Sequence, residues 1–187
     1  MMKAIIPFSH QLLEEVVLPG ESVVDATCGN GNDTIMLSKL VSNTGRVYAF
    51  DIQKQAIEKT SARLAEQKIE HVELIHDGHE KVATYVKEET IAGGIFNLGY
   101  LPKGDHSIIT TPDTTIKAIR EMLPLLKKQG RIVLVIYHGH QGGKEEKDEV
   151  ISLCEALDQK QYQVLQYQFI NQVNNPPFIV AIEKLTQ

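Results

Sequence analysis

Short apolar runs alternate with amphipathic helical segments along most of this chain, and this alternation constrains the fold more than any other feature. The apolar runs that are predicted to be strands are Ser22–Asp25, Arg46–Phe50, His71–Ile75, Ile91–Leu98 and Arg131–Tyr137. Between them, apolar residues recur at helical spacing, which predicts a helix in most of the connections. Strands joined through helices need crossover connections, so we expect a parallel sheet covered on both faces.

Two further strands close the chain without a helix between them. Tyr162–Ile170 and Phe178–Glu183 flank a polar loop with two prolines, so they are predicted to form an antiparallel hairpin. The chain, residues 1–187, is therefore expected to be one doubly wound, Rossmann-like α/β domain with a mostly parallel, seven-stranded sheet. In such a fold the ligand site lies at the carboxyl ends of the strands.

Local signals predict where two of the helices begin and end. Ser9 is predicted to cap the first helix. A later helix begins with Pro112 at its first position and is predicted to end at Gly130, although Pro124 should kink or shorten it. The apolar stripe of that later helix consists of Ile116, Ile119, Leu123 and Leu126.

The charge balance of the chain is acidic. Its 187 residues include 19 Lys and Arg against 24 Asp and Glu, which gives a formal net charge of −5. Nucleic-acid-binding proteins usually carry a basic excess, so an RNA partner would need a local basic patch or a second subunit. No apolar stretch approaches the ~18 residues that span a membrane. The two cysteines have no metal or redox spacing, which favours a reducing cytoplasm.

The segment after the first strand carries the most specific motif. Residues 25–34 read D-A-T-C-G-N-G-N-D-T, a turn between a strand and a helix in which Gly29 and Gly31 let the backbone approach a ligand. A dinucleotide-binding loop would have a third glycine where Thr34 stands. The loop of S-adenosylmethionine-dependent methyltransferases instead follows an acid, as here, and has its first glycine where Thr27 stands. The acid favours a methyltransferase over a dehydrogenase, which remains an alternative.

Acids follow the next two strands as well. Asp51 could accept both hydroxyls of a ribose, and Asp77 stands where an adenine ring would lie. One aspartate after a strand is often only a turn former or a helix cap, but three that face one crevice predict a nucleoside cofactor. The residues predicted to bind S-adenosylmethionine are Asp25, Thr27, Gly29, Asn30, Gly31, Asn32, Asp33, Asp51, Gln53, Asp77, His79 and Asn97.

These motifs carry a family resemblance. From Asp25 through the final hairpin, the chain resembles a class I S-adenosylmethionine-dependent methyltransferase. More narrowly, it resembles the small stand-alone bacterial proteins labelled rRNA methylases, on the segments D-A-T-C-G-N-G-N-D-T (25–34), F-D-I-Q (50–53), N-L-G-Y-L-P (97–102) and Y-H-G-H-Q-G-G (137–143). That family is linked to a tRNA wobble-uridine activity. The resemblance therefore implies N-methylation of 5-aminomethyl-2-thiouridine, with the tRNA anticodon loop as partner and substrate.

The resemblance also implies residues that act on the substrate. Asn97-Leu98-Gly99-Tyr100 stands where amino-methyltransferases acting on nucleobases have Asn-Pro-Pro-Tyr, so Asn97 and Tyr100 are the predicted catalytic residues. The amide oxygen would accept a hydrogen bond from the target amine, and the aromatic ring would stack on the base. The two central residues depart from the proline pair, which fits an alkylamine better than an aromatic amine. The chemistry needs no covalent nucleophile, so Cys28 is predicted to pack in its loop.

Basic and imidazole side chains complete the candidate set. Lys103, His138 and His140 are predicted to contact the substrate, and two histidines without a third ligand argue against a metal site. The charge run Lys144–Asp148 is predicted to be a solvated helix start. A homodimer would give one small domain more surface for an RNA stem-loop. The alternatives are an rRNA methyltransferase, a small-molecule methyltransferase and a nucleotide-binding module without catalysis.

Overall fold

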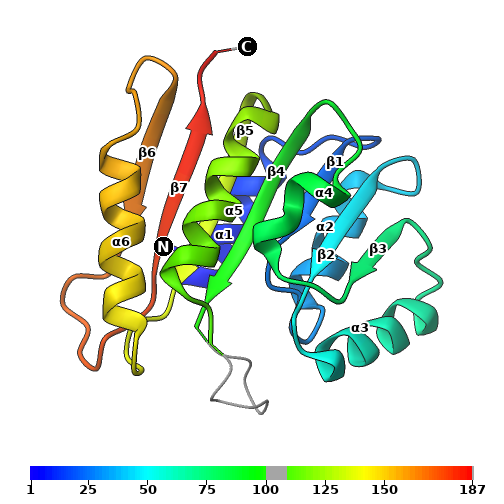
Figure 1. Cartoon of the computed structure of the whole chain (residues 1–187), viewed down its shortest axis with the longest axis horizontal. Helices are drawn as coiled ribbons and strands as arrows, with labels where there is room; N and C mark the ends of the chain where they lie inside the picture. Colours follow the sequence, from blue (N-terminus) through cyan, green and yellow to red (C-terminus); the bar gives the residue numbers. More distant parts are fainter. Residues whose placement is uncertain (100–108, 187) are drawn as a thin grey trace.

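The computed structural model describes residues 1–99 and 109–186. Within these residues the strands form one sheet in the order β3-β2-β1-β4-β5-β7-β6 (Figure 1). Strands β1 to β5 pair in parallel, whereas β7 is antiparallel to both β5 and β6. The strands are β1 (Ser22–Asp25), β2 (Arg46–Phe50), β3 (Val72–Ile75), β4 (Ile91–Leu98), β5 (Leu126–Ile136), β6 (Tyr162–Tyr167) and β7 (Phe178–Lys184). The predicted fold class is confirmed, including the antiparallel hairpin.

Along β1, β2, β4, β5 and β7, neighbouring side chains alternate between two separate cores. Val23 packs with α1 and α2 on one face of the sheet, while Val24 packs with α5 on the other. In Figure 1, α5 and α6 lie in front of the sheet and α1 and α2 lie behind it. The helices are α1 (Ile5–Glu14), α2 (Asn32–Val41), α3 (Lys54–Glu66), the 3₁₀ helix η1 (His79–Lys81), α4 (Val82–Tyr85), α5 (Pro112–Leu125) and α6 (Gly143–Glu155). Across the described ranges, none of these helices combines the length and the apolar character needed to cross a bilayer.

The first helix begins earlier than its predicted cap. α1 starts at Ile5, and Ser9 lies inside the helix, fully buried, where its Oγ donates to the carbonyl oxygen of Ile6 at 2.8 Å. A serine that bonds to the preceding turn in this way is tolerated inside a helix. The prediction of Ser9 as N-cap was therefore wrong, because the hydroxyl has a partner that the sequence pattern does not reveal.

α5 also ends earlier than predicted. It stops one residue after Pro124, because proline lacks an N–H and its ring clashes with the preceding turn. Leu126, predicted to belong to the apolar stripe of the helix, is instead the first residue of β5 and pairs with Ile91. Gly130, predicted to end the helix, lies within β5, where an added Cβ would come within 2.9 Å of a backbone carbonyl oxygen of β4.

Candidate active site

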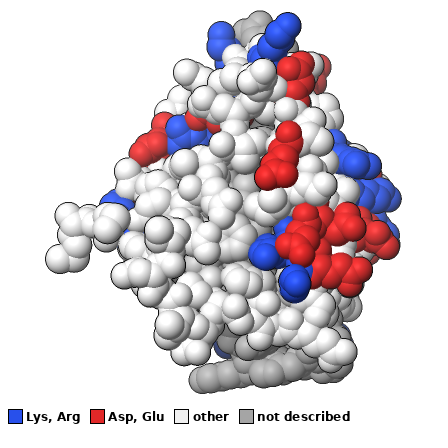
Figure 2. Space-filling view, turned by 90° about the vertical axis from the view of Figure 1, so that its left-hand side faces the viewer, with Lys and Arg blue, Asp and Glu red and all other residues white. Residues whose placement is uncertain are grey.

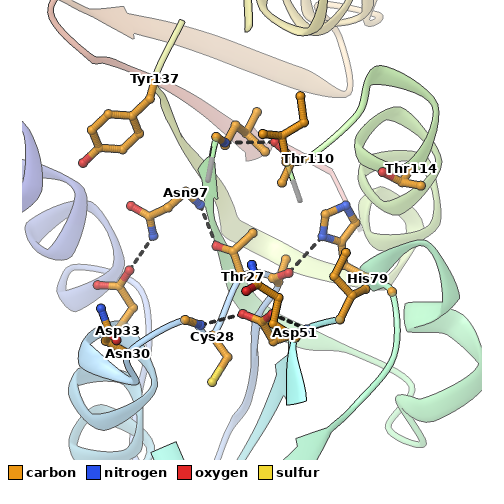
Figure 3. A pocket seen from close by; sticks show the side chains of 18 of the residues that line it. Thr27, Cys28, Asn30, Asp33, Asp51, His79, Asn97, Thr110, Thr114 and Tyr137 are labelled. Carbon is orange, nitrogen blue, oxygen red and sulfur yellow. Dashed lines mark hydrogen bonds between the residues drawn. The ribbon is translucent and has the colours of Figure 1, made fainter. Parts of the chain in front are cut away.

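A cavity of about 670 Å³ opens at the carboxyl ends of the parallel strands (Figure 3). Its walls come from the loops after β1, β2, β3 and β4, with α1 and the start of α5 beside them. Its volume lies in the range of small-molecule sites. The predicted cofactor residues that line it are Thr27, Gly29, Asn30, Asn32, Asp33, Asp51, Gln53, Asp77, His79 and Asn97. The fold thus gathers residues from four strand ends around one space.

Asp25 is not among the residues that line the cavity. It is fully buried, and its two carboxylate oxygens accept hydrogen bonds from the Thr27 N–H at 3.2 Å and the Thr34 hydroxyl at 2.6 Å. Burial, together with the nearby charge of Asp33, raises the pKa of Asp25 to about 7. The structure therefore places Asp25 behind the loop, where it holds the turn together. Thr34, in the position of a third glycine, supplies one of the hydrogen bonds that do so.

Gly31, which also lies off the cavity lining, is required for packing. Its φ of 77° is in the left-handed region, and an added Cβ would lie 2.7 Å from Oγ1 of Thr60 on α3. The Thr60 hydroxyl donates to the Gly29 carbonyl oxygen at 3.2 Å and accepts from the Cys28 thiol at 3.3 Å. The second loop glycine therefore lets α3 pack against the loop. Burial raises the pKa of Cys28 to about 12, so this thiol stays protonated and is no nucleophile.

Asp51 joins the loops that follow β1 and β2. Its Oδ2 accepts from the Gly29 N–H at 2.8 Å, and its Oδ1 accepts from the Gln53 N–H at 2.8 Å. Burial raises the pKa of Asp51, and these two backbone hydrogen bonds oppose the rise. Each carboxylate oxygen retains a further acceptor position. The geometry therefore leaves Asp51 able to hold two ribose hydroxyls.

Protein contacts tie Asp77 and His79 into the cavity wall. Asp77 accepts from Lys81 Nζ at 2.6 Å and from the Tyr85 hydroxyl at 2.9 Å, and the lysine lowers the pKa of this carboxyl. Nδ1 of His79 lies 2.9 Å from the Ala26 carbonyl oxygen, so Nδ1 carries the proton and Nε2 is an acceptor. Burial lowers the pKa of His79 and keeps the ring neutral. Nε2 is buried without a partner among the described residues, as expected of an atom that accepts from a ligand.

Asn30 and Asn32 connect the glycine loop to α3. The amide oxygen of Asn30 accepts from Lys59 Nζ at 2.7 Å, and its backbone carbonyl oxygen accepts from Arg63. The amide oxygen of Asn32 accepts from Arg63 Nη1 at 2.8 Å. Both asparagines line the cavity and brace its rim against the helix.

Asn97, near the end of β4, is held at two points. Its backbone N–H donates to Thr27 Oγ1 at 2.7 Å, and its Nδ2 donates to Asp33 Oδ2 at 2.6 Å. Thr27 replaces the first glycine of the methyltransferase loop, and its hydroxyl makes a hydrogen bond that glycine could not. Tyr137, which follows β5, stands beside Asn97 in Figure 3 and lines the cavity. Sequence reasoning missed Tyr137 as a site residue because its one signal is its place at a strand end.

The residues predicted to contact the substrate are placed differently. Tyr100 and Lys103 lie outside the described residues, and His138 and His140 do not line the cavity. The His138 ring packs edge-on against Phe178, with centroids 5.6 Å apart. The His140 ring lies so close to the start of α6 that a Cβ added to Gly143 would be 2.7 Å from it. Both histidines lie between the end of β5 and the start of α6, and their contact with a substrate stays a prediction.

Glu146 corrects the interpretation of the charge run as a solvated helix start. Glu145 and Asp148 are exposed, but Glu146 is buried with 1% exposure. Its carboxylate accepts from the hydroxyls of Thr110 at 2.6 Å and Thr115 at 2.7 Å, and Thr110 Oγ1 also accepts from the backbone N–H after β4 at 2.9 Å. Glu146 thus links α6, α5 and the end of β4. The sequence holds no sign of this, because the threonines lie more than thirty positions away.

His10 is a second feature whose place in the site the sequence left open. It lines the cavity together with Ile6, one helical turn earlier on α1, and its Nε2 lies 2.6 Å from Asp33 Oδ1. Spacing by four residues puts these two side chains on one face of the helix, which is the signal that could have found them. The residues present fit a nucleoside cofactor: a glycine loop, an aspartate for the ribose and a buried acceptor atom on the wall.

A family model described as "Putative rRNA methylase" matches residues 47–183. The chain belongs to this methylase family. A curated relative, the chloroplastic tRNA (mnm(5)s(2)U34)-methyltransferase of Arabidopsis thaliana, is 39% identical over 186 residues. That match covers 94% of this chain and 68% of the plant protein.

Solved structures agree with this membership. A "putative rRNA-methylase" from Clostridium thermocellum is 45% identical, with a TM-score of 0.96, covering 99% of this chain and 100% of that one. A "putative methyltransferase" from Streptococcus mutans, solved in complex with SAH, is also 45% identical, with a TM-score of 0.91 and coverage of 99% and 100%. The family resemblance and the methyltransferase fold predicted from the motifs are thereby confirmed.

Proposed function

We propose that this protein is an S-adenosylmethionine-dependent tRNA methyltransferase that N-methylates the 5-aminomethyl group of 5-aminomethyl-2-thiouridine at the wobble position. The observation that carries the proposal is the 39% identity to the plant tRNA (mnm(5)s(2)U34)-methyltransferase over 94% of this chain. The cavity supports it independently, since it offers both a nucleoside site and an amide at the end of β4. The SAH bound to the Streptococcus mutans relative supports the choice of cofactor.

The residues of the cavity suit methyl transfer to an amine. S-adenosylmethionine supplies a methyl group on a sulfonium, which an uncharged amine takes in one in-line displacement while the C–S electrons pass to sulfur. Asp51 and the glycine loop would hold the nucleoside. The Asn97 amide oxygen would accept an N–H of the amine and orient its lone pair, and such orientation is the main contribution that this reaction needs. Ile6, Leu98 and Ile109 also line the cavity, and an apolar wall favours the neutral amine.

We also propose that the protein acts on the anticodon loop as a homodimer. The segment from Gln161 to Ile182 contains no charged residue, and Val164 and Leu165 on the edge strand β6 are 41% and 46% exposed. Figure 2 shows this side as a broad uncharged surface, with acidic and basic side chains gathered to one side of it. An exposed apolar edge strand is suited to pair with a second copy.

Both cysteines are buried free thiols, which supports the reducing cytoplasm that we propose as the setting.

The test uses tRNA and rRNA purified from cells that lack this protein. Incubation with the purified protein and S-adenosylmethionine, followed by nucleoside mass spectrometry, should convert 5-aminomethyl-2-thiouridine into 5-methylaminomethyl-2-thiouridine in tRNA. Methylation of rRNA alone would replace the proposed substrate, and the absence of methylation in both RNAs would favour a small-molecule methyltransferase.

Light scattering tests the dimer: the protein should be dimeric and the Leu165→Lys variant monomeric, whereas a monomeric wild type would refute it.

A further inference from the structure

The Asp33 carboxylate lies between two side chains from other parts of the chain. His10 Nε2 on α1 is 2.6 Å from Asp33 Oδ1, and Asn97 Nδ2 on β4 is 2.6 Å from Asp33 Oδ2. A carboxylate without a proton can only accept, so both nitrogens donate to it. The side chains of His10 and Asp33 are 23% and 12% exposed, so their contact is largely shielded from water. All three residues line the cavity.

This arrangement determines which way the Asn97 amide faces. The side-chain amide of an asparagine can rotate by half a turn, which exchanges the positions of its oxygen and nitrogen. Only the NH₂ group can donate a hydrogen bond to the Asp33 carboxylate. The amide oxygen therefore points away from Asp33, and in Figure 3 it lies on the side of Tyr137. The backbone of Asn97 is held as well, since its N–H donates to Thr27 Oγ1 at 2.7 Å. The residue thus has one orientation of its acceptor atom rather than two.

We infer that Asp33 and His10 are positioning residues for methyl transfer: Asp33 holds the Asn97 amide with its oxygen toward the substrate amine, and His10 holds Asp33. The inference rests on the proposed function. With the amide turned over, its NH₂ group would face the N–H groups of the amine, and donors cannot bond to donors. The inference gives Asp33 a role beyond the predicted contact with the cofactor, because its two oxygens bond to His10 and Asn97.

The hydrogen bond that His10 donates to Asp33 has a titration signature. Bonding to Asp33 raises the pKa of His10 above its ordinary 6.5, with smaller contributions from the charges of Glu14 and Asp25, while burial opposes the rise. Removing the charge at Asp33 should therefore lower the pKa of His10. This readout follows the Asp33–His10 contact itself and does not depend on any methyl transfer.

Exchanging the donor and the acceptor tests the inference. Asp33→Asn lets the Asn97 amide turn over, and Asn97→Asp places two carboxylates against each other. Each single variant should lower kcat on the modified tRNA by about tenfold or more, the effect of losing one charge-assisted hydrogen bond, with SAH affinity within about threefold of wild type. In the double variant, the new amide at position 33 would accept from His10 and donate to the new carboxylate at position 97, so kcat should recover to well above that of either single variant.

Variants of His10 and of a surface acid complete the test. His10→Gln retains a donor toward Asp33 and should keep most of the activity, whereas His10→Phe removes it and should lower kcat rather than raise KM for tRNA. Asp148→Asn, the same acid-to-amide change at a side chain that is 57% exposed, should leave kcat unchanged. Thermal melts of all variants separate loss of folding from loss of positioning.

The outcomes keep the inference and the proposed function apart. Wild-type kcat in Asp33→Asn, or a double variant no better than the poorer single one, would overturn the inference, as would loss of SAH binding in Asp33→Asn. If the wild type methylates no RNA, the proposed function fails. In that case, the pKa of His10 is measured by NMR titration in the wild type and in Asp33→Asn. If this pKa is the same in both proteins, Asp33 does not hold the His10 imidazole.

Discussion

Replacing Asp25 with asparagine should stabilise this protein at neutral pH, although it removes an acid that the methyltransferase motif includes. Asp25 is fully buried, and its carboxylate accepts hydrogen bonds from the Thr27 N–H and the Thr34 hydroxyl. An asparagine can keep both contacts, since its oxygen accepts from the backbone and its NH₂ group donates to the hydroxyl. The substitution therefore removes the buried charge and little else.

The size and sign of the effect follow from the pKa. Burial first, and the charge of Asp33 second, raise the pKa of Asp25 from 3.8 to about 7 in the folded state. Between these values the folded state binds a proton that the unfolded chain has released, so stability falls as pH rises through this window and is constant above it. About three pKa units correspond to about 4 kcal/mol. Asp25→Asn should thus gain little near pH 4 and up to about 4 kcal/mol at pH 8.

Urea denaturation at pH 4.5 and pH 8 measures this difference. The free energy of unfolding of Asp25→Asn should exceed that of wild type at pH 8 and approach it at pH 4.5. Glu58→Gln makes the same change at a side chain that is 65% exposed and should shift stability by less than about 0.5 kcal/mol at both pH values. The reasoning is refuted if Asp25→Asn is less stable than wild type at pH 8, or if its gain is the same at both.

Three further substitutions test the loop, the buried acid and the division of labour in the cavity. Gly31→Ala should lose about 1–2 kcal/mol more stability than Gly20→Ala. Both glycines have positive φ, but of the two only Gly31 has a threonine of α3 within 3 Å of an added Cβ. Equal losses of stability in the two variants would contradict this. Glu146→Ala should lose about 2–4 kcal/mol in chemical denaturation, since the half-buried Thr110 hydroxyl and the buried Thr115 hydroxyl lose their acceptor. Glu145→Ala, at the exposed preceding residue, should change stability little. Asp51→Ala should weaken SAH binding in calorimetry by about tenfold or more, whereas Asn97→Ala should keep that affinity and lower turnover. If both variants bind SAH more weakly, Asn97 binds the cofactor as Asp51 does, and this division of roles is refuted.

Most of the fold follows from the spacing of apolar residues. The run from Arg131 to Tyr137 can only be a buried strand, and alternate side chains such as Val133 and Leu134 do face the two cores. The helix ends were less predictable. Ser9 and Gly130 each have a local signal for a boundary, but Ser9 is fully buried inside α1 and Gly130 packs within β5 against β4. Local signals of this kind compete with core packing, and packing is the stronger.

Part of the candidate site was predictable for a simple reason. Acids that follow consecutive parallel strands must lie at one edge of the sheet, so Asp51 and Asp77 could be placed at one cavity without any coordinates. Their partners could not be placed. The contact of His10 with Asp33 and that of Asp33 with Asn97 join positions 23 and 64 residues apart.

The sequence by itself determined the succession of strands along the chain, the edge of the sheet that holds the site and the family to which the chain belongs. Periodicity and short motifs are local properties, so they can be recognised in the amino-acid sequence alone. Only the tertiary structure decided that Asp25 is buried behind its loop, that Gly31 accommodates α3 and that Glu146 is a buried link. A carboxylate has the same formula in water and in a core. What it does depends on neighbours that only the folded chain brings within hydrogen-bonding distance.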